Sequence, residues 1–314
     1  MRPCRFFYRL GMKSVGIKPY VWMLCGCGWF SIMALTARSL ADTCDWQVVA
    51  VFRSGLACLI AFVVAKITRT PLVFLRPRML WVRSISGSCS MVAGFYAFAK
   101  MDTSTVLTFT NTFPVWVALL SWPLLREKPT SGVWIAVLCA VLGVGVTLRP
   151  FDGAVPFQPA ASAVFASLTT AIAMLGLNRL KGVKPLAVIL HFSFVSTIFS
   201  AVALFVFPCT HGVEQLYEPI TLVKLGVVGL TGTIGQLFLT WAFSTGSATK
   251  VSVVGLSQVA LVMFLEAMLG WKTIDLLNVV GTTLVLGPTG WLMARERKPP
   301  IKPDETDLAE AAIE

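Results

Sequence analysis

The sequence YAFAKMDTSTV at residues 96–106 recurs in altered form as WAFSTGSATKV at residues 241–251. Each copy has an aromatic-Ala-Phe triplet at the end of an apolar segment, then a short polar turn, then the start of another apolar segment. Leu142-Gly143 and Leu286-Gly287 match in the same way, in the last apolar segment of each half. The chain is therefore predicted to contain an internal duplication.

The composition places these segments in a lipid bilayer. The 314-residue chain is 56% hydrophobic and 13% charged, with a mean hydropathy of +0.78. A soluble helix carries polar residues on its outward face, whereas residues 51–65 and 133–148 are apolar almost all round. An integral membrane protein is expected, with the lipid bilayer as its main partner.

The length of the apolar segments predicts their number. A helix needs roughly 20 apolar residues to cross the hydrocarbon core. Ten such segments occur, at residues 20–38, 46–66, 80–99, 104–124, 131–149, 159–178, 185–206, 222–243, 250–270 and 275–294. Five helices per half is an odd number, so the second half must be inverted relative to the first.

The expected fold is an all-α membrane protein of about ten transmembrane helices, arranged as two inverted five-helix repeats. Its predicted parts are a basic cytoplasmic leader (1–19), a first repeat (20–149), a linker (150–158), a second repeat (159–294) and a cytoplasmic disordered tail (295–314).

The net charge of +11 is spread over short loops. Lys and Arg are enriched in cytoplasmic loops, so their distribution predicts the orientation. With both termini in the cytoplasm of a plasma (inner) membrane protein, the outside keeps Arg38, Lys100, Arg149, Lys224 and Lys272. The inside then receives Arg2, Arg5, Arg9, Lys13, Lys18, Lys66, Arg69, Arg76, Arg78, Arg83, Arg126, Lys128, Arg179, Lys181, Lys184, Lys250, Arg295, Arg297, Lys298 and Lys302. Such scattered cations argue against a nucleic-acid partner.

Two charged residues inside predicted helices are the first candidates for the transport pathway. An ionisable side chain at the bilayer centre costs at least about 2.5–3.5 kcal/mol, so its presence suggests a function. Arg53 and Glu266 lie at similar depths from the outer side and could pair or face a common cavity. Arg53 could equally snorkel to the headgroups. Glu266 is either a carrier of a coupling proton or a structural partner.

Polar and aromatic residues form a second group of pathway candidates, because lipid offers them no hydrogen bonds. Each could instead bridge helices or anchor at the interface; they are Asn111, Gln236, Gln258, His191, Tyr96, Trp116 and Trp241. Pro114 is expected to interrupt a helix and free a backbone carbonyl near Thr110. Arg126, Glu127 and Lys128 are expected to form a structural cluster with Pro114 at the inner end of the fourth helix.

Several stretches together resemble a known family: Phe52-Arg53, residues 95–99, residues 111–116, residues 124–128 and residues 143–145. On these residues the chain resembles the drug/metabolite transporter superfamily, in the group with two EamA-type domains. The resemblance implies a secondary carrier of small metabolites that works by alternating access. Members of the family export or import, and export is the direction predicted for this chain. The chain departs from the family pattern at residues 270–272, where similar proteins often carry a Glu, and at Gln258 or Val259, which take the place of Pro114.

Other functions lack their sequence signals. No His-Glu-x-x-His motif and no pair of intramembrane aspartates occurs, so no catalytic residue is assigned and an intramembrane enzyme is the weaker alternative. Cys25 and Cys27 lie about 200° apart on a helix, which does not suit a metal site, and no metal or cofactor is expected. The motifs of a channel are missing. A sensor or scaffold with a transporter fold stays open, as does the choice between monomer and homodimer.

Overall fold

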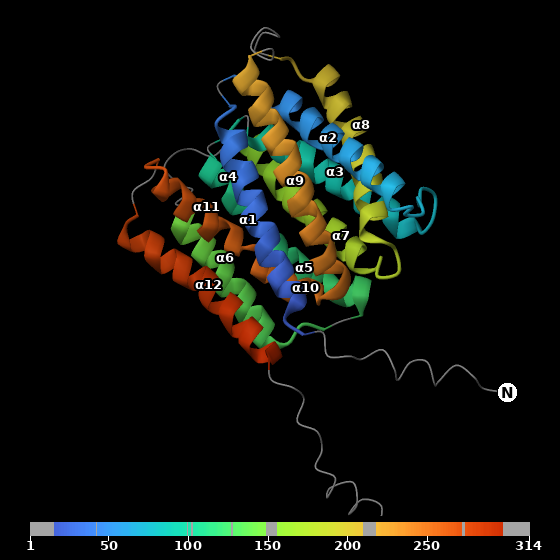
Figure 1. The fold of residues 1–314 in the computed structure, drawn as a ribbon. Helices are drawn as coiled ribbons and strands as arrows, with labels where there is room; N and C mark the ends of the chain where they lie inside the picture. Colours follow the sequence, from blue (N-terminus) through green and yellow to red (C-terminus); the bar gives the residue numbers. More distant parts are fainter. Residues whose placement is uncertain are drawn as a thin grey trace, which may run out of the picture.

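The computed structural model describes residues 16–297, apart from residues 42, 99, 102, 127, 149–155, 210–217 and 272–273. Within these residues the protein is all helical and contains no strand (Figure 1). The first half holds α1 (Lys18–Arg38), α2 (Trp46–Ile67), α3 (Arg78–Phe98), α4 (Thr103–Thr110), α5 (Phe113–Leu125) and α6 (Ser131–Leu148). The second half holds α7 (Phe157–Asn178), α8 (Pro185–Val206), α9 (Pro219–Thr245), α10 (Ala248–Gly255), α11 (Ser257–Met268) and α12 (Leu276–Arg297).

The helices agree closely with the ten predicted segments, with two differences. The fourth and ninth predicted helices are each broken into two, α4 with α5 and α10 with α11. Among the described residues, seven segments are long and apolar enough to cross a membrane, counting α10 and α11 as one. The protein is therefore a multi-pass membrane protein, and the count of ten spans stays a prediction. Most of the predicted leader, linker and tail lies outside the described residues.

The two halves pack as equivalent units. The most extensive contacts join one half to the other: α1 lies along α9, and α3 lies along α7 in the corresponding way. Two further helices pack against their own counterparts, α2 against α8 and α6 against α12. A pseudo-twofold axis between two repeats generates this set of pairs. In keeping with an even number of crossings, α1 begins and α12 ends at the same, lower end of the bundle (Figure 1).

Side chains make hydrogen bonds to backbone carbonyls at both helix breaks. Asn111 Nδ2 donates to the carbonyl of Leu107 at 2.8 Å, which also accepts from the Asn111 backbone N–H at 2.9 Å, so the amide is tied to its own helix. In the second half, Cys27 Sγ lies 3.4 Å from the carbonyl oxygen of Gly255. Pro114 does not sit in mid-helix as predicted, because it occupies the first turn of α5, where a missing N–H costs little. The second break, at Leu256, forms without any proline.

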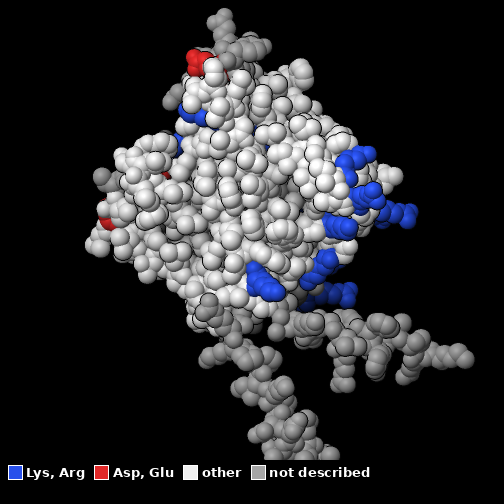
Figure 2. All heavy atoms as spheres, in the orientation of Figure 1, with Lys and Arg blue, Asp and Glu red and all other residues white. Residues whose placement is uncertain are grey.

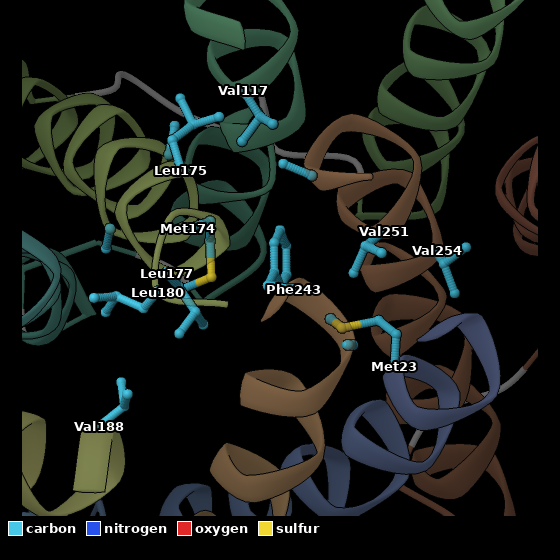
Figure 3. Packing of buried hydrophobic residues seen from close by; sticks show 14 of the residues in the cluster. Met23, Val117, Met174, Leu175, Leu177, Leu180, Val188, Phe243, Val251 and Val254 are labelled. Atoms are coloured by element: carbon cyan, nitrogen blue, oxygen red, sulfur yellow. The ribbon is translucent and has the colours of Figure 1, made fainter. Parts of the chain in front are cut away.

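The largest buried apolar cluster lies at the end of the bundle where α1 begins. Figure 3 shows Phe243 near its centre, between Met174 and Leu177 of α7 and Val251 of α10. Asn178 fixes this region, since its amide nitrogen donates to the carbonyls of Phe243 and Gly246 at 2.7 and 2.8 Å. This end of the molecule is therefore closed by tight apolar packing.

The surface has the charge distribution of a membrane protein. Figure 2 shows a wide uncharged surface, with most of the visible Lys and Arg side chains gathered at the lower right. The described turns after α2, α5 and α7 carry exposed cations that were all predicted to lie inside: Lys66, Arg69, Arg76, Arg126, Lys128, Arg179, Lys181 and Lys184. Large apolar side chains such as Leu59, Ile135 and Phe205 are exposed, as expected for contact with lipid.

Candidate functional site

A small cavity lies between α2, α3, α8 and α9, where the two repeats meet. The space there that no atom fills is about 260 Å³ when space open to the outside is included, and the enclosed part has room for about one water molecule, so a metabolite would require the helices to move apart. Its walls carry a cation, an amide and several hydroxyls among small and apolar side chains: Arg53, Ser54, Ala57, Met91, Phe192, Ser193, Ser196, Gly232 and Gln236.

The residues from α2 and α8 occupy equivalent positions in the two repeats. Both helices are 22 residues long, and they begin at Trp46 and Pro185. Counted from these starts, the eighth residues are Arg53 and Phe192, the ninth are Ser54 and Ser193, and the twelfth are Ala57 and Ser196. All six line the cavity.

The same holds for α3 and α9. Met91 and Gln236 each lie five residues before the recurring triplets, which begin at Tyr96 and Trp241. Gly87 and Gly232 each lie nine residues before them, and of these two glycines Gly232 lines the cavity. The cavity therefore lies on the pseudo-twofold axis. Both repeats contribute equivalent positions to its wall, but the side chains at these positions differ in charge and polarity.

Arg53 is the cation of the cavity wall. Its guanidinium is in contact with two thioethers: Nε lies 3.2 Å from Met33 Sδ and Nη1 lies 2.9 Å from Met91 Sδ. A thioether is a weak acceptor and does not neutralise a guanidinium. Gly232 gives the side chain its room, since a Cβ there would lie 3.2 Å from Arg53 Nε. Sulfur atoms, which carry no negative charge, thus hold the charge of Arg53 beside the cavity.

Arg83 corrects the loop assignment made from the charge bias. It lies in α3, more than a turn beyond the start at Arg78, and is only 1% exposed. Its guanidinium carbon lies 4.1 Å from the ring centre of Phe192, and Nε and Nη1 have no hydrogen-bond partner among the described residues. A Cβ at Gly87 would lie 2.3 Å from Arg83 Nη1, so only glycine leaves space for this stack. A second cation therefore stands behind a residue of the cavity wall.

Neutral polar groups complete the wall. Gln236 is 7% exposed, and its Nε2 has no hydrogen-bond partner in the described part of the chain. Ser196 Oγ is 2.8 Å from Ser88 Oγ, which also donates to the carbonyl of Ser84 in α3. A buried amide donor without a partner costs about 1–3 kcal/mol, so such a group points to a ligand or a water molecule.

His191 lies next to this wall and outside the cavity. It is 2% exposed, and its Nδ1 is 2.7 Å from Ser84 Oγ. Trp81 packs edge-on against its ring, with the centroids 4.7 Å apart. His191 directly precedes Phe192 in α8, so its hydrogen bond to Ser84 joins α8 to α3 beside the cavity wall.

Glu266 pairs with Arg38 and not with Arg53. Arg38 Nη1 and Glu266 Oε1 form an ion pair between the ends of α1 and α11, where the Arg38 side chain is 53% exposed and that of Glu266 13%. Arg38 also lies over the ring of Trp271, 5.8 Å from its centroid. Glu266 was predicted to lie at a depth similar to that of Arg53, but it is not among the residues that line the cavity.

The other predicted site residues lie elsewhere. Tyr96 packs against Phe207, with centroids 5.6 Å apart, and Trp241 packs against Trp22 at 5.7 Å. Trp116 borders the large apolar cluster, and Gln258 follows the break at Leu256. Of the predicted structural cluster, Arg126 ends α5 in the left-handed conformation, Lys128 lies 5.0 Å from the ring centre of Trp122, and Glu127 lies outside the described residues.

The predicted pathway set thus contributes Arg53 and Gln236 to the cavity. The lining residues that the sequence reasoning missed are small or hydroxylic, and single residues of this kind give no signal. Aligning α2 with α8 from their first residues would have found them, because Arg53 then identifies Phe192, Ser193 and Ser196. Across the described part of the chain, no group of three His, Cys, Asp or Glu side chains could hold a metal ion.

Comparison with known proteins gives a consistent picture. The model of the EamA-like transporter family matches residues 17–149 and again residues 159–292. A pseudopaline exporter, CntI of Pseudomonas aeruginosa (strain UCBPP-PA14), is 28% identical over 228 residues, which are 71% of this chain and 78% of that protein. An uncharacterized transporter of Helicobacter pylori (strain J99) is 24% identical over 211 residues, 67% of this chain and 71% of that one.

A more distant relative and a solved structure extend the comparison. The uncharacterized membrane protein YMR253C of Saccharomyces cerevisiae is 22% identical over 266 residues, 76% of this chain and 63% of that protein. One crystal structure superposes with a TM-score of 0.74 over 89% of this chain and 97% of its own, at 17% identity. That likeness shows a shared fold.

Proposed function

Because the chain belongs to the EamA-like transporter family, we propose that it is a secondary carrier that exports small metabolites by alternating access between its two repeats. The observation that carries the proposal is the cavity on the pseudo-twofold axis. Its wall takes equivalent positions from both repeats and includes a cation and a buried amide. Inverted repeats bind substrate at their interface, where two equivalent arrangements can open the site to either side in turn.

Different contacts hold the helices together at the two ends of the bundle. The apolar cluster around Phe243 seals the end where α1 begins, so opening there requires α7, α9 and α10 to separate. The ion pair between Arg38 and Glu266 joins α1 and α11 at the other end. The breaks near Asn111 and Leu256 are natural hinges, because a backbone that is already interrupted can bend without losing more helical hydrogen bonds.

Direction and location are part of the proposal. Export is favoured by the named exporter among the relatives. A plasma (inner) membrane location with both termini in the cytoplasm is favoured by the exposed cations of the turns after α2, α5 and α7, since Lys and Arg are retained on the cytoplasmic side. On this orientation the cluster around Phe243 is the cytoplasmic closure.

Proton coupling through Glu266 stays a hypothesis. The carboxylate is engaged by Arg38 at the ends of α1 and α11, which supports a structural role in this conformation. A carrier role would require Arg38 to withdraw during the cycle. Transport by Glu266→Gln at several external pH values tests this, because a proton carrier would lose its pH dependence with the carboxylate.

Flux measurements on a mixture of metabolites test the proposal and identify the substrate at the same time. Purified protein is reconstituted into liposomes loaded with a cell metabolite extract, and released compounds are identified by mass spectrometry. A carrier releases particular metabolites with saturation and shows counterflow. Ala57→Phe, which fills the cavity, should abolish release, whereas Leu59→Phe on the exposed face of the same helix should not.

The alternatives give other results in the same assay. A sensor or scaffold releases nothing above empty liposomes, and a channel releases compounds without saturation. An intramembrane enzyme would convert a metabolite into a new compound. Absence of release by the wild-type protein would refute the carrier.

A further inference from the structure

From the wall of the central cavity we infer that the transported metabolite is an anion, carrying a carboxylate or phosphate group that is bound by Arg53. This inference rests on the proposed function and specifies its substrate class. The four helices that form the cavity, α2, α3, α8 and α9, contain no aspartate or glutamate. The cation of the wall therefore has no acidic partner on any of the helices that surround it.

The contacts of Arg53 leave it ready for a ligand. Its nitrogen atoms are engaged by Met33 and Met91 sulfur at 3.2 and 2.9 Å, which hold the side chain without compensating its charge. A guanidinium presents a fork of N–H donors that matches the two oxygens of a carboxylate or phosphate. An anion in the cavity would supply the charge that thioethers cannot.

The second arginine strengthens the preference. Arg83 lies against the ring of Phe192, which lines the cavity, and two of its nitrogen atoms are buried without a partner among the described residues. Arg83 therefore adds a second positive charge close to the cavity. This charge attracts an anion in the cavity and repels a cation.

Neutral donors lie around the same space. Gln236 offers an Nε2 that no described residue engages, and Ser193 also lines the cavity. The hydroxyls of Ser54 and Ser196 already donate, to the carbonyl of Ala50 and to Ser88 Oγ, so they can only accept. The Gln236 amide can therefore bind a further oxygen atom of an acid. Arg53 sets the charge class, and the neutral donors orient the rest of the molecule.

The experiment compares charge classes. A cell extract is separated at pH 7 into the fraction that binds an anion-exchange resin and the fraction that flows through, and each is loaded into proteoliposomes with the full-length protein. Release from the bound fraction alone is expected. Phosphatase treatment of that fraction before loading distinguishes phosphate esters, whose release would cease, from carboxylates, whose release would continue.

Variants connect the selectivity to the residue. Arg53→Gln should lower the rate of anion release about 10- to 100-fold, the loss expected when a charged hydrogen-bond donor is removed. Arg53→Lys, which keeps the charge, should retain part of the rate and the same selectivity. Arg179→Gln is the matched control, since Arg179 is an exposed arginine in the turn after α7. Gel filtration and the melting temperature establish that each variant is folded.

The outcomes are distinguishable. Release of neutral or cationic compounds by the wild-type protein, or anion release by folded Arg53→Gln at the wild-type rate, would overturn the inference and leave the carrier intact. Release of nothing from either fraction would instead refute the proposed function.

Discussion

Replacing Gly143 with alanine tests the packing of the two repeats at the contact between α6 and α12. A Cβ at Gly143 would lie 2.7 Å from the carbonyl oxygen of Gly281 and 2.8 Å from Leu284 Cβ. Ordinary contact begins near 3.4 Å, so the helices would have to separate by about 0.7 Å, the difference between 3.4 and 2.7 Å. The carbonyl oxygen of Gly281 is a backbone atom, so no side-chain rotation can move it aside. We expect Gly143→Ala to lower the free energy of unfolding by about 1–3 kcal/mol, the usual cost of overpacking.

Gly145, two residues further along α6, provides the matched control. A Cβ there has no atom within 4 Å, and alanine is favoured over glycine in a helix by about 0.5–1 kcal/mol. The two variants should therefore move stability in opposite directions. For the detergent-purified protein, the melting temperature should fall by roughly 2–12 °C for Gly143→Ala and rise by roughly 1–4 °C for Gly145→Ala, at about 2–4 °C per kcal/mol. Equal shifts, or a rise for both, would refute the close approach of α6 and α12.

Three more predictions concern the site and its surroundings. A double-mutant cycle of Arg38→Gln and Glu266→Gln should give a coupling of at most about 1 kcal/mol in denaturant titrations, because the pair is partly exposed; a larger value would mean a buried pair. Ser84→Ala should cost about 1–3 kcal/mol in the same titrations, because it leaves His191 Nδ1 buried without a partner, and an unchanged midpoint would contradict this. Desolvation raises the pKa of the Cys209 thiol, so its labelling by an impermeant maleimide on intact cells should be slow at pH 7 and accelerate as the pH rises. Labelling that occurs only after permeabilisation would show that Cys209 lies on the cytoplasmic side, opposite to the proposed orientation.

The sequence predicted the helical segments well because the length of an apolar run is a direct physical constraint. Their ends differ from the predicted ones by one to three residues at most positions, as at Phe157, where α7 begins two residues early. The break in the first half was suggested by Pro114, yet the break at Leu256 has no such signal. Packing against α1 holds that second break, through contacts such as that of Cys27 with Gly255.

The candidate site was predicted in part, for a reason that lies in helix geometry. Counting residues along a helix gives depth, and depth placed Arg53 and Glu266 at one level. It does not give the direction in which a side chain points or the helix that it meets, so the partner of Glu266 was missed. The charge bias had a related weakness: it counted Arg83 with the cytoplasmic loop cations although the predicted segment 80–99 already contained it, and α3 buries its side chain.

The internal duplication explains the shape of the cavity, and its divergence explains the chemistry. Both cations belong to the first repeat, on α2 and α3, whereas the equivalent of Arg53 in the second repeat is Phe192. The second repeat supplies neutral polar side chains instead, those of Ser193, Ser196 and Gln236. Under the proposed alternating access, both arginines stay on the first repeat whichever conformation the repeats adopt. The proposed carrier would therefore keep the same charge preference in both of its states, which selective transport of one class of metabolite requires.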